Sequence, residues 1–84
     1  MVSLLQPYDL GPLRLPNRVV MAPMTRVRAT RDGLAGPSTA TYYAQRATAG
    51  LIVSEGAQPS LPGQSNPHTP GLHSDAAVEA WRGL

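Results

Sequence analysis

The stretch GPSTATYYAQRATAGLIVSE, residues 36–55, decides the fold because it joins a helical pattern to a strand pattern almost without a connection. Glycine at the N-cap and proline at the first helical position are typical of a helix start, here Gly36 and Pro37. The apolar residues at helical spacing are Ala40, Tyr43, Ala44 and Ala47. The pattern predicts a helix over 37–49 with one apolar face, closed by Gly50 as a C-cap glycine.

Two short apolar segments flank that helix. Residues 18–22 form a continuous apolar run behind Arg18, and residues 51–55, LIVSE, form a second one. Continuous rather than alternating apolar residues are typical of strands in a parallel sheet that is covered on both faces. The order strand, helix, strand predicts a βαβ unit with parallel strands, and therefore an α/β fold.

The remaining segments predict simpler elements. Residues 8–15, YDLGPLRL, indicate a small hairpin that turns at Gly11 and Pro12. Residues 56–73 form a long loop with four prolines, and loops of this length are usually functional or disordered. Ser74 is a plausible N-cap for a final helix, whose apolar stripe is Ala77, Val78 and Trp81.

Composition excludes several classes of function. The chain has 84 residues, which predicts one domain at most. Its seven arginines are scattered and its aromatic residues are few, which argues against a nucleic-acid partner. It has no cysteine, no apolar run near the ~20 residues of a membrane span, and no basic, apolar leader over residues 1–5. We therefore expect a cytoplasmic protein that contacts no membrane.

The end of the first predicted strand carries a functional signal. In NRVVMAPMTR, residues 17–26, the apolar run stops abruptly at Pro23 and is followed by Met24, Thr25 and Arg26. A strand that only contributes to a hydrophobic core does not require a hydroxyl and a guanidinium side by side at its end. The segment therefore predicts a strand end that faces a ligand.

Four stretches carry a resemblance to a known family. They are PNRVVMAPMTR (16–26), YYAQRATAGLIVSEG (42–56), PGQSNPHTPGLHSD (62–75) and VEAWR (78–82). In order and spacing the chain resembles the N-terminal part of the Old Yellow Enzymes, FMN-dependent ene-reductases. The resemblance implies the N-terminal portion of a (β/α)8 TIM barrel over residues 1–84: a hairpin, strand 1, helix 1, strand 2 and the start of helix 2.

The resemblance also implies a flavin site. Ala22, Pro23, Met24 and Thr25 match the family segment that lies against FMN, with the Thr25 hydroxyl hydrogen-bonded to a flavin carbonyl. Gly56 matches a small residue that contacts the flavin through its backbone, and a glycine there permits a close approach. The implied reductant is NAD(P)H and the implied substrate is an activated alkene. Both segments follow strand ends, where barrel enzymes carry their chemistry.

Other polar residues receive structural interpretations. Asn66 stands where many family members have a loop tyrosine, and its amide could contact a substrate. His68 and His73 do not match the family's substrate-anchoring pair, and no acidic or cysteine partner sits at metal-ligand spacing. We interpret Arg26 as a solvated surface residue and Glu55 as a structural hydrogen-bonding group. No residue is assigned as catalytic or as a metal ligand.

Two strands cannot close a barrel of eight. The first expectation is therefore a fragment that carries part of a flavin pocket and is inactive alone. An alternative is a non-catalytic module that binds a partner, either as an oligomer or with a second chain that completes the barrel, because open strand edges invite pairing. A basic nucleic-acid binder rests only on the pI of about 9.7.

Overall fold

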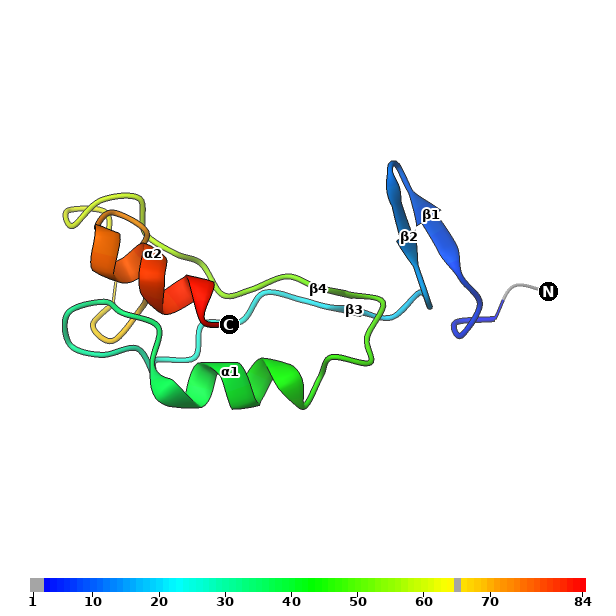
Figure 1. Ribbon diagram of the computed structural model, residues 1–84, viewed down its shortest axis with the longest axis horizontal. Coiled ribbons are helices and arrows are strands. Elements are labelled where there is room, and N and C mark those ends of the chain that lie inside the picture. The colour runs from blue at the N-terminus through cyan, green and yellow to red at the C-terminus, as the bar shows by residue number, and fades with distance from the viewer. Residues whose placement is uncertain (1–2, 65) are drawn as a thin grey trace.

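The computed structural model describes residues 3–64 and 66–84. Residues 1 and 2, on which the expectation about a leader depends, and Ser65 of the predicted 56–73 loop lie outside this described part. The elements of the described part are β1 (Tyr8–Leu10), β2 (Leu13–Leu15), β3 (Val20–Met21), α1 (Pro37–Ala44), β4 (Leu51–Ile52) and α2 (Asp75–Arg82). Figure 1 shows the β1–β2 hairpin at one end of an elongated chain and α2 near the other.

The predicted hairpin is confirmed. Strands β1 and β2 pair antiparallel, with Tyr8 opposite Leu15. The turn between them contains Gly11 at a φ of +55°, a conformation that glycine adopts without steric cost. Leu15 is the buried member of the hairpin, so the hairpin attaches to the rest of the chain through the end of β2.

The predicted βαβ unit is also confirmed, because β3 and β4 pair in parallel with Val20 opposite Leu51. Beyond the two paired positions, the Val53 amide donates to the Met21 carbonyl at 3.0 Å. Both strands are shorter than the predicted 18–22 and 51–55 because each has a neighbour on one side only. Val20 is 51% exposed, so the predicted burial on both faces is wrong for the described residues.

The end of the first helix differs from the prediction. Helix α1 ends at Ala44 with Gln45 as its C-cap, instead of continuing to residue 49. From Arg46 onward the backbone amides bond to carbonyls three residues back, and such tighter bonds end an α-helix. Tyr43 is half-buried, whereas Ala40, Ala44 and Ala47 are exposed, so the predicted apolar face of α1 is not buried within the described residues.

Gly50 has a different function from the predicted C-cap. A Cβ atom at this position would lie 2.1 Å from the Asn17 carbonyl oxygen, which is far inside van der Waals contact. The Asn17 side-chain amide also donates to the Thr48 carbonyl at 2.8 Å. The glycine therefore permits the close passage of two backbones where the chain enters β4.

The long loop 56–73 is held in place by backbone hydrogen bonds where it is described. The Gln58 amide donates to the Pro70 carbonyl at 3.1 Å, and the Gly71 amide donates to the Gly33 carbonyl at 2.8 Å. The Ala29 amide donates to the His68 carbonyl at 3.1 Å. These contacts join the loop after β4 to the loop after β3, and both loops lie at the same end of the sheet (Figure 1).

Helix α2 is attached to the end of the long loop. The predicted N-cap is confirmed, since the Ser74 hydroxyl oxygen accepts a hydrogen bond from the Ala77 amide at 3.1 Å. Ala77 is almost fully buried. The Trp81 indole donates to the Gly71 carbonyl at 3.2 Å, which anchors the helix to the end of the long loop.

Candidate functional site

Residues 22–25 follow β3 directly and belong to no helix or strand. All four side chains, those of Ala22, Pro23, Met24 and Thr25, are exposed, and Met24 is among the more exposed apolar residues of the chain. The segment therefore leaves the sheet as an accessible stretch of backbone with mainly apolar side chains. A planar apolar ligand could lie against such a stretch.

Thr25 and Gly56 come together at the ends of the two parallel strands. Both line a cavity of about 260 Å³, whose other lining residues are Ala57, Gln58, Pro59, Gly63 and Thr69. A Cβ atom built on Gly56 would meet nothing within 4 Å, so a ligand can approach the backbone there. Ala22, Pro23 and Met24 do not line this cavity, although they lie immediately before Thr25 in the chain.

A buried carboxylate holds these two strand ends together. Glu55 is 4% exposed, and its Oε1 accepts a hydrogen bond from the Arg26 amide at 3.3 Å. The Glu55 amide in turn donates to the Tyr43 hydroxyl at 2.9 Å. Because Arg26 follows Thr25 and Glu55 precedes Gly56, this bond sets the separation of the two cavity residues. The structural interpretation of Glu55 is confirmed.

Gln58 is a site residue that sequence reasoning missed. Its side chain is buried, and its Nε2 donates to the Thr69 carbonyl at 3.1 Å. The Thr69 hydroxyl donates to the Asn66 carbonyl at 2.6 Å. These bonds fix the wall of the cavity that contains Thr25 and Gly56. The only signal in the sequence is a polar residue two positions beyond a strand end.

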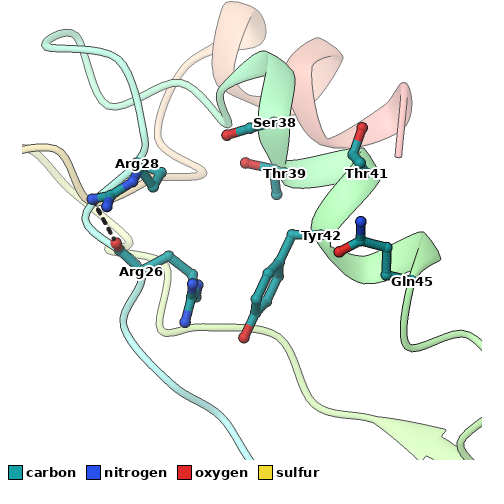
Figure 2. A pocket seen from close by; sticks show the side chains of 7 residues that line it. All are labelled: Arg26, Arg28, Ser38, Thr39, Thr41, Tyr42 and Gln45. Atoms are coloured by element: carbon teal, nitrogen blue, oxygen red, sulfur yellow. Dashed lines mark hydrogen bonds between the residues drawn. The ribbon is translucent and has the colours of Figure 1, made fainter.

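A second cavity lies between the start of α1 and the loop after β3. It has a volume of about 360 Å³ and is lined by Arg26, Arg28, Ser38, Thr39, Thr41, Tyr42 and Gln45 (Figure 2). The Arg26 guanidinium carbon lies 3.9 Å from the centroid of the Tyr42 ring, a cation–π distance. The interpretation of Arg26 as a freely solvated side chain is therefore wrong, because its guanidinium stacks on a helix residue.

The two histidines lie in the loop after β4, and each contacts another loop residue. His68 Nδ1 is 3.1 Å from the Ala29 carbonyl oxygen, and its backbone adopts a φ of +59°. His73 lies against Gly71, where an added Cβ would meet its ring at 2.7 Å. Across residues 3–64 and 66–84, His, Asp and Glu side chains form no cluster of three that could hold a metal ion. The same residues contain no helix long and apolar enough to cross a membrane.

The chain matches a known family along almost its whole length. Residues 3–84 match the model of the NADH:flavin oxidoreductase / NADH oxidase family. Among characterised proteins, the chain is 48% identical over 80 residues to 12-oxophytodienoate reductase 7 of Oryza sativa subsp. japonica. That match covers 94% of this chain and 20% of the relative.

Solved structures show the same similarity in three dimensions. The chain is 51% identical to the old yellow enzyme homologue of Zymomonas mobilis, with a TM-score of 0.91 over 95% of this chain and 22% of that structure. It is 44% identical to morphinone reductase in complex with tetrahydroNAD, with a TM-score of 0.92 over 99% of this chain and 23% of that one.

The 84 residues thus span about a fifth of the length of the curated relatives that they match. The prediction of the N-terminal portion of a (β/α)8 barrel agrees with these superpositions, because the hairpin, β3, α1, β4 and α2 fit as one unit. The resemblance to the Old Yellow Enzymes is confirmed, and the chain belongs to the NADH:flavin oxidoreductase / NADH oxidase family.

Proposed function

We propose that these residues supply the first part of the FMN site of an ene-reductase. The observation that supports this proposal best is the shared cavity of Thr25 and Gly56. The two residues are 31 positions apart in sequence and come from the ends of neighbouring parallel strands. Barrel enzymes place their chemistry at that end of the strands.

The residues present fit a flavin. Gly56 leaves open space where a side chain would stand, so its backbone can approach a flat ring closely. We assign Ala22, Pro23 and Met24 to contacts with the ring system. The Thr25 hydroxyl would donate a hydrogen bond to a flavin carbonyl, which stabilises negative charge on that oxygen. The chemistry that FMN supplies when bound is hydride transfer from a nicotinamide to an activated C=C bond.

The names of the relatives support a reduction that uses a nicotinamide. The rice relative is a 12-oxophytodienoate reductase, and morphinone reductase has been solved with tetrahydroNAD. We extend to this chain the use of NAD(P)H and a small activated alkene as substrate. A cytoplasmic location is part of the same proposal, and cell fractionation would check it.

We further propose that the 84 residues do not catalyse the reaction alone. Two parallel strands and a cavity of about 260 Å³ are present, whereas cofactor sites usually enclose about 300–1,000 Å³. The experiment is an FMN titration of the purified chain followed by flavin fluorescence, then an assay of enone reduction with NADPH. We expect weak saturable quenching without turnover. Clear turnover by pure chain would refute the proposed inactivity, and the absence of quenching would refute a flavin site built by these residues.

A second candidate function is supported by the open sheet. Val19, Val20 and Val53 are 44%, 51% and 41% exposed on β3, β4 and their continuations. Exposed apolar strands with free edges pair readily with other strands. The chain would then bind a complementary barrel segment or a second copy of itself. Sedimentation of the purified chain tests this, because a monodisperse monomer that retains no second polypeptide would refute it.

A further inference from the structure

Arg26 is fixed at both its backbone and its side chain, although it lies in a loop. Its amide donates to the carboxylate of the buried residue Glu55 at 3.3 Å. Its guanidinium carbon lies 3.9 Å from the centroid of the Tyr42 ring, and Figure 2 shows the Arg26 side chain extending from the loop towards that ring. Tyr42 belongs to α1, whereas Glu55 follows β4. Arg26 is therefore held by a helix and by the neighbouring strand end at the same time.

The Tyr42 ring is itself held in place by its neighbours in the chain. The Arg46 guanidinium carbon also lies 3.9 Å from the Tyr42 ring centroid, and Arg46 Nη1 donates to the Tyr42 carbonyl at 2.9 Å. The Tyr43 ring contacts the Tyr42 ring edge-on, with the two centroids 5.2 Å apart. Contacts of both kinds are attractive. Because they come from residues next to Tyr42 in sequence, they restrict the ring without involving the loop that contains Arg26.

The backbone directly after Arg26 is strained. Val27 adopts a φ of +55°, a left-handed conformation that is an outlier for a β-branched side chain. Such a conformation persists only where the surrounding contacts hold it. Val27 is 43% exposed, so its own side chain contributes little to that hold. The contacts of Arg26 hold the chain before the strained residue, and the Ala29 amide, bonded to the His68 carbonyl, holds it afterwards.

The position of Thr25 depends on these contacts because Thr25 shares a peptide bond with Arg26. Thr25 is exposed, so packing around its own side chain does not fix its position. A hydroxyl that is to meet one ligand atom must be held to within about 0.5 Å of the productive geometry. The anchored peptide on the C-terminal side of Thr25 can provide that precision.

We propose that Arg26 is a positioning residue for Thr25 and that the Tyr42 ring is its anchor. In this assignment Arg26 does not touch the ligand. It holds the peptide bond that keeps Thr25 in the cavity shared with Gly56. The proposal rests on the proposed function, because it concerns the residue assigned to the flavin carbonyl. It adds a side chain of helix α1 to the determinants of flavin binding.

The first measurement needs no ligand. Tyr42→Leu removes the aromatic surface, and Arg26→Gln removes the guanidinium that stacks on it, so the second variant decides the question if the first fails to fold. Nitrogen-15 relaxation of the 84-residue chain gives the order parameters of the Thr25 and Arg26 amides. Both variants should lower these values from about 0.85 to about 0.6. Unchanged values would overturn the proposal, and so would a loss of order in Arg26→Gln that extends to Ala77 of α2, because it would indicate a general folding defect.

The second measurement is an FMN titration of the same chain, followed by flavin fluorescence. Tyr42→Leu and Arg26→Gln should each weaken FMN binding about three- to tenfold. The upper limit is the loss expected for removing the Thr25 hydroxyl itself, because the stack acts through that group. A larger loss would contradict this route.

Two further variants serve as the rescue and the matched control. Tyr42→Phe keeps the aromatic ring and should bind FMN within about twofold of the parent chain. Arg46→Gln removes a guanidinium that lies at the same 3.9 Å from the same ring but does not belong to the loop. It should also stay within about twofold. Equal weakening by Arg46→Gln and Arg26→Gln would overturn the proposal, as would a failure of Tyr42→Phe to retain binding.

A double substitution tests whether the stack acts through Thr25. In a Thr25→Val background, Tyr42→Leu should weaken FMN binding by no more than about a further twofold, because the effects of residues that act through one another are not additive. A full additional loss would show that Tyr42 affects the ligand by another route and would overturn the proposal. Failure of the parent chain to bind FMN would refute the proposed flavin site alone, since the order parameters test the anchor without a ligand.

Discussion

Replacing Gly50 with alanine should break the junction between β3 and β4. An alanine Cβ at this position would lie 2.1 Å from the Asn17 carbonyl oxygen and 3.0 Å from its side-chain oxygen. The first neighbour is backbone, so it cannot rotate out of the way as the tip of a flexible side chain could. Relief requires the two backbone segments to separate by more than an ångström.

That separation would affect the hydrogen bonds at the entrance to the sheet. The Gly50 amide donates to the Val19 carbonyl at 2.9 Å and the Leu51 amide to the same carbonyl at 3.4 Å. The Asn17 side-chain amide bonds the Thr48 carbonyl at 2.8 Å. At about 1 kcal/mol for each bond, Gly50→Ala should lower the free energy of unfolding by about 2–4 kcal/mol. This loss is a large part of the roughly 5–15 kcal/mol of a typical domain.

Gly56→Ala is the matched control. The added methyl group there meets nothing within 4 Å, and its backbone is not in the left-handed region. Its free energy of unfolding should therefore change by no more than about 0.5 kcal/mol. Urea denaturation followed by Trp81 fluorescence measures both variants. If Gly50→Ala unfolds within about 0.5 kcal/mol of the parent, the steric argument is wrong.

Three further substitutions test single contacts. Ser74→Ala removes the N-cap of α2 and should cost about 1 kcal/mol of unfolding free energy, with loss of helical circular dichroism on heating. Tyr43→Phe leaves the buried Glu55 amide without its partner and should cost about 1–3 kcal/mol in urea denaturation; a neutral result would mean that water replaces the hydroxyl. Thr25→Val should leave stability within about 0.5 kcal/mol, because the residue is exposed. It should weaken flavin binding about tenfold in the fluorescence titration if its hydroxyl bonds a flavin carbonyl; equal affinity would contradict that assignment.

The elements that sequence predicted correctly depend on local rules. Ser74 was recognisable as an N-cap because capping needs only a hydroxyl three residues before a free amide. The parallel pairing of β3 and β4 followed from a short βαβ connection, whose handedness and direction are strongly constrained. The end of α1 was mispredicted because Gly50 matches a C-cap pattern, whereas its contact with Asn17 spans 33 positions of the sequence.

In the candidate site too, residues in local motifs were recognised from the sequence, whereas contacts between distant segments were not. Thr25 and Gly56 were assigned to the flavin through family motifs at strand ends, and this assignment stays a prediction, although both residues line one cavity. Gln58 and the Arg26–Tyr42 stack were missed because neither residue type nor spacing reveals which side chains meet across two loops. Glu55 was interpreted correctly from its position at the end of an apolar strand, because a carboxylate there needs a hydrogen-bond donor.

Glu55 also links the two cavities physically. Its carboxylate bonds the amide of Arg26, which lines the cavity at the start of α1, whereas the preceding Thr25 lines the cavity that contains Gly56. Movement of this one backbone amide would therefore displace the Thr25 hydroxyl and the Arg26 guanidinium together. A ligand bound in either cavity would restrain the same peptide. A ligand that contacted both cavities would gain from this coupling, because the first contact reduces the entropy lost in making the second.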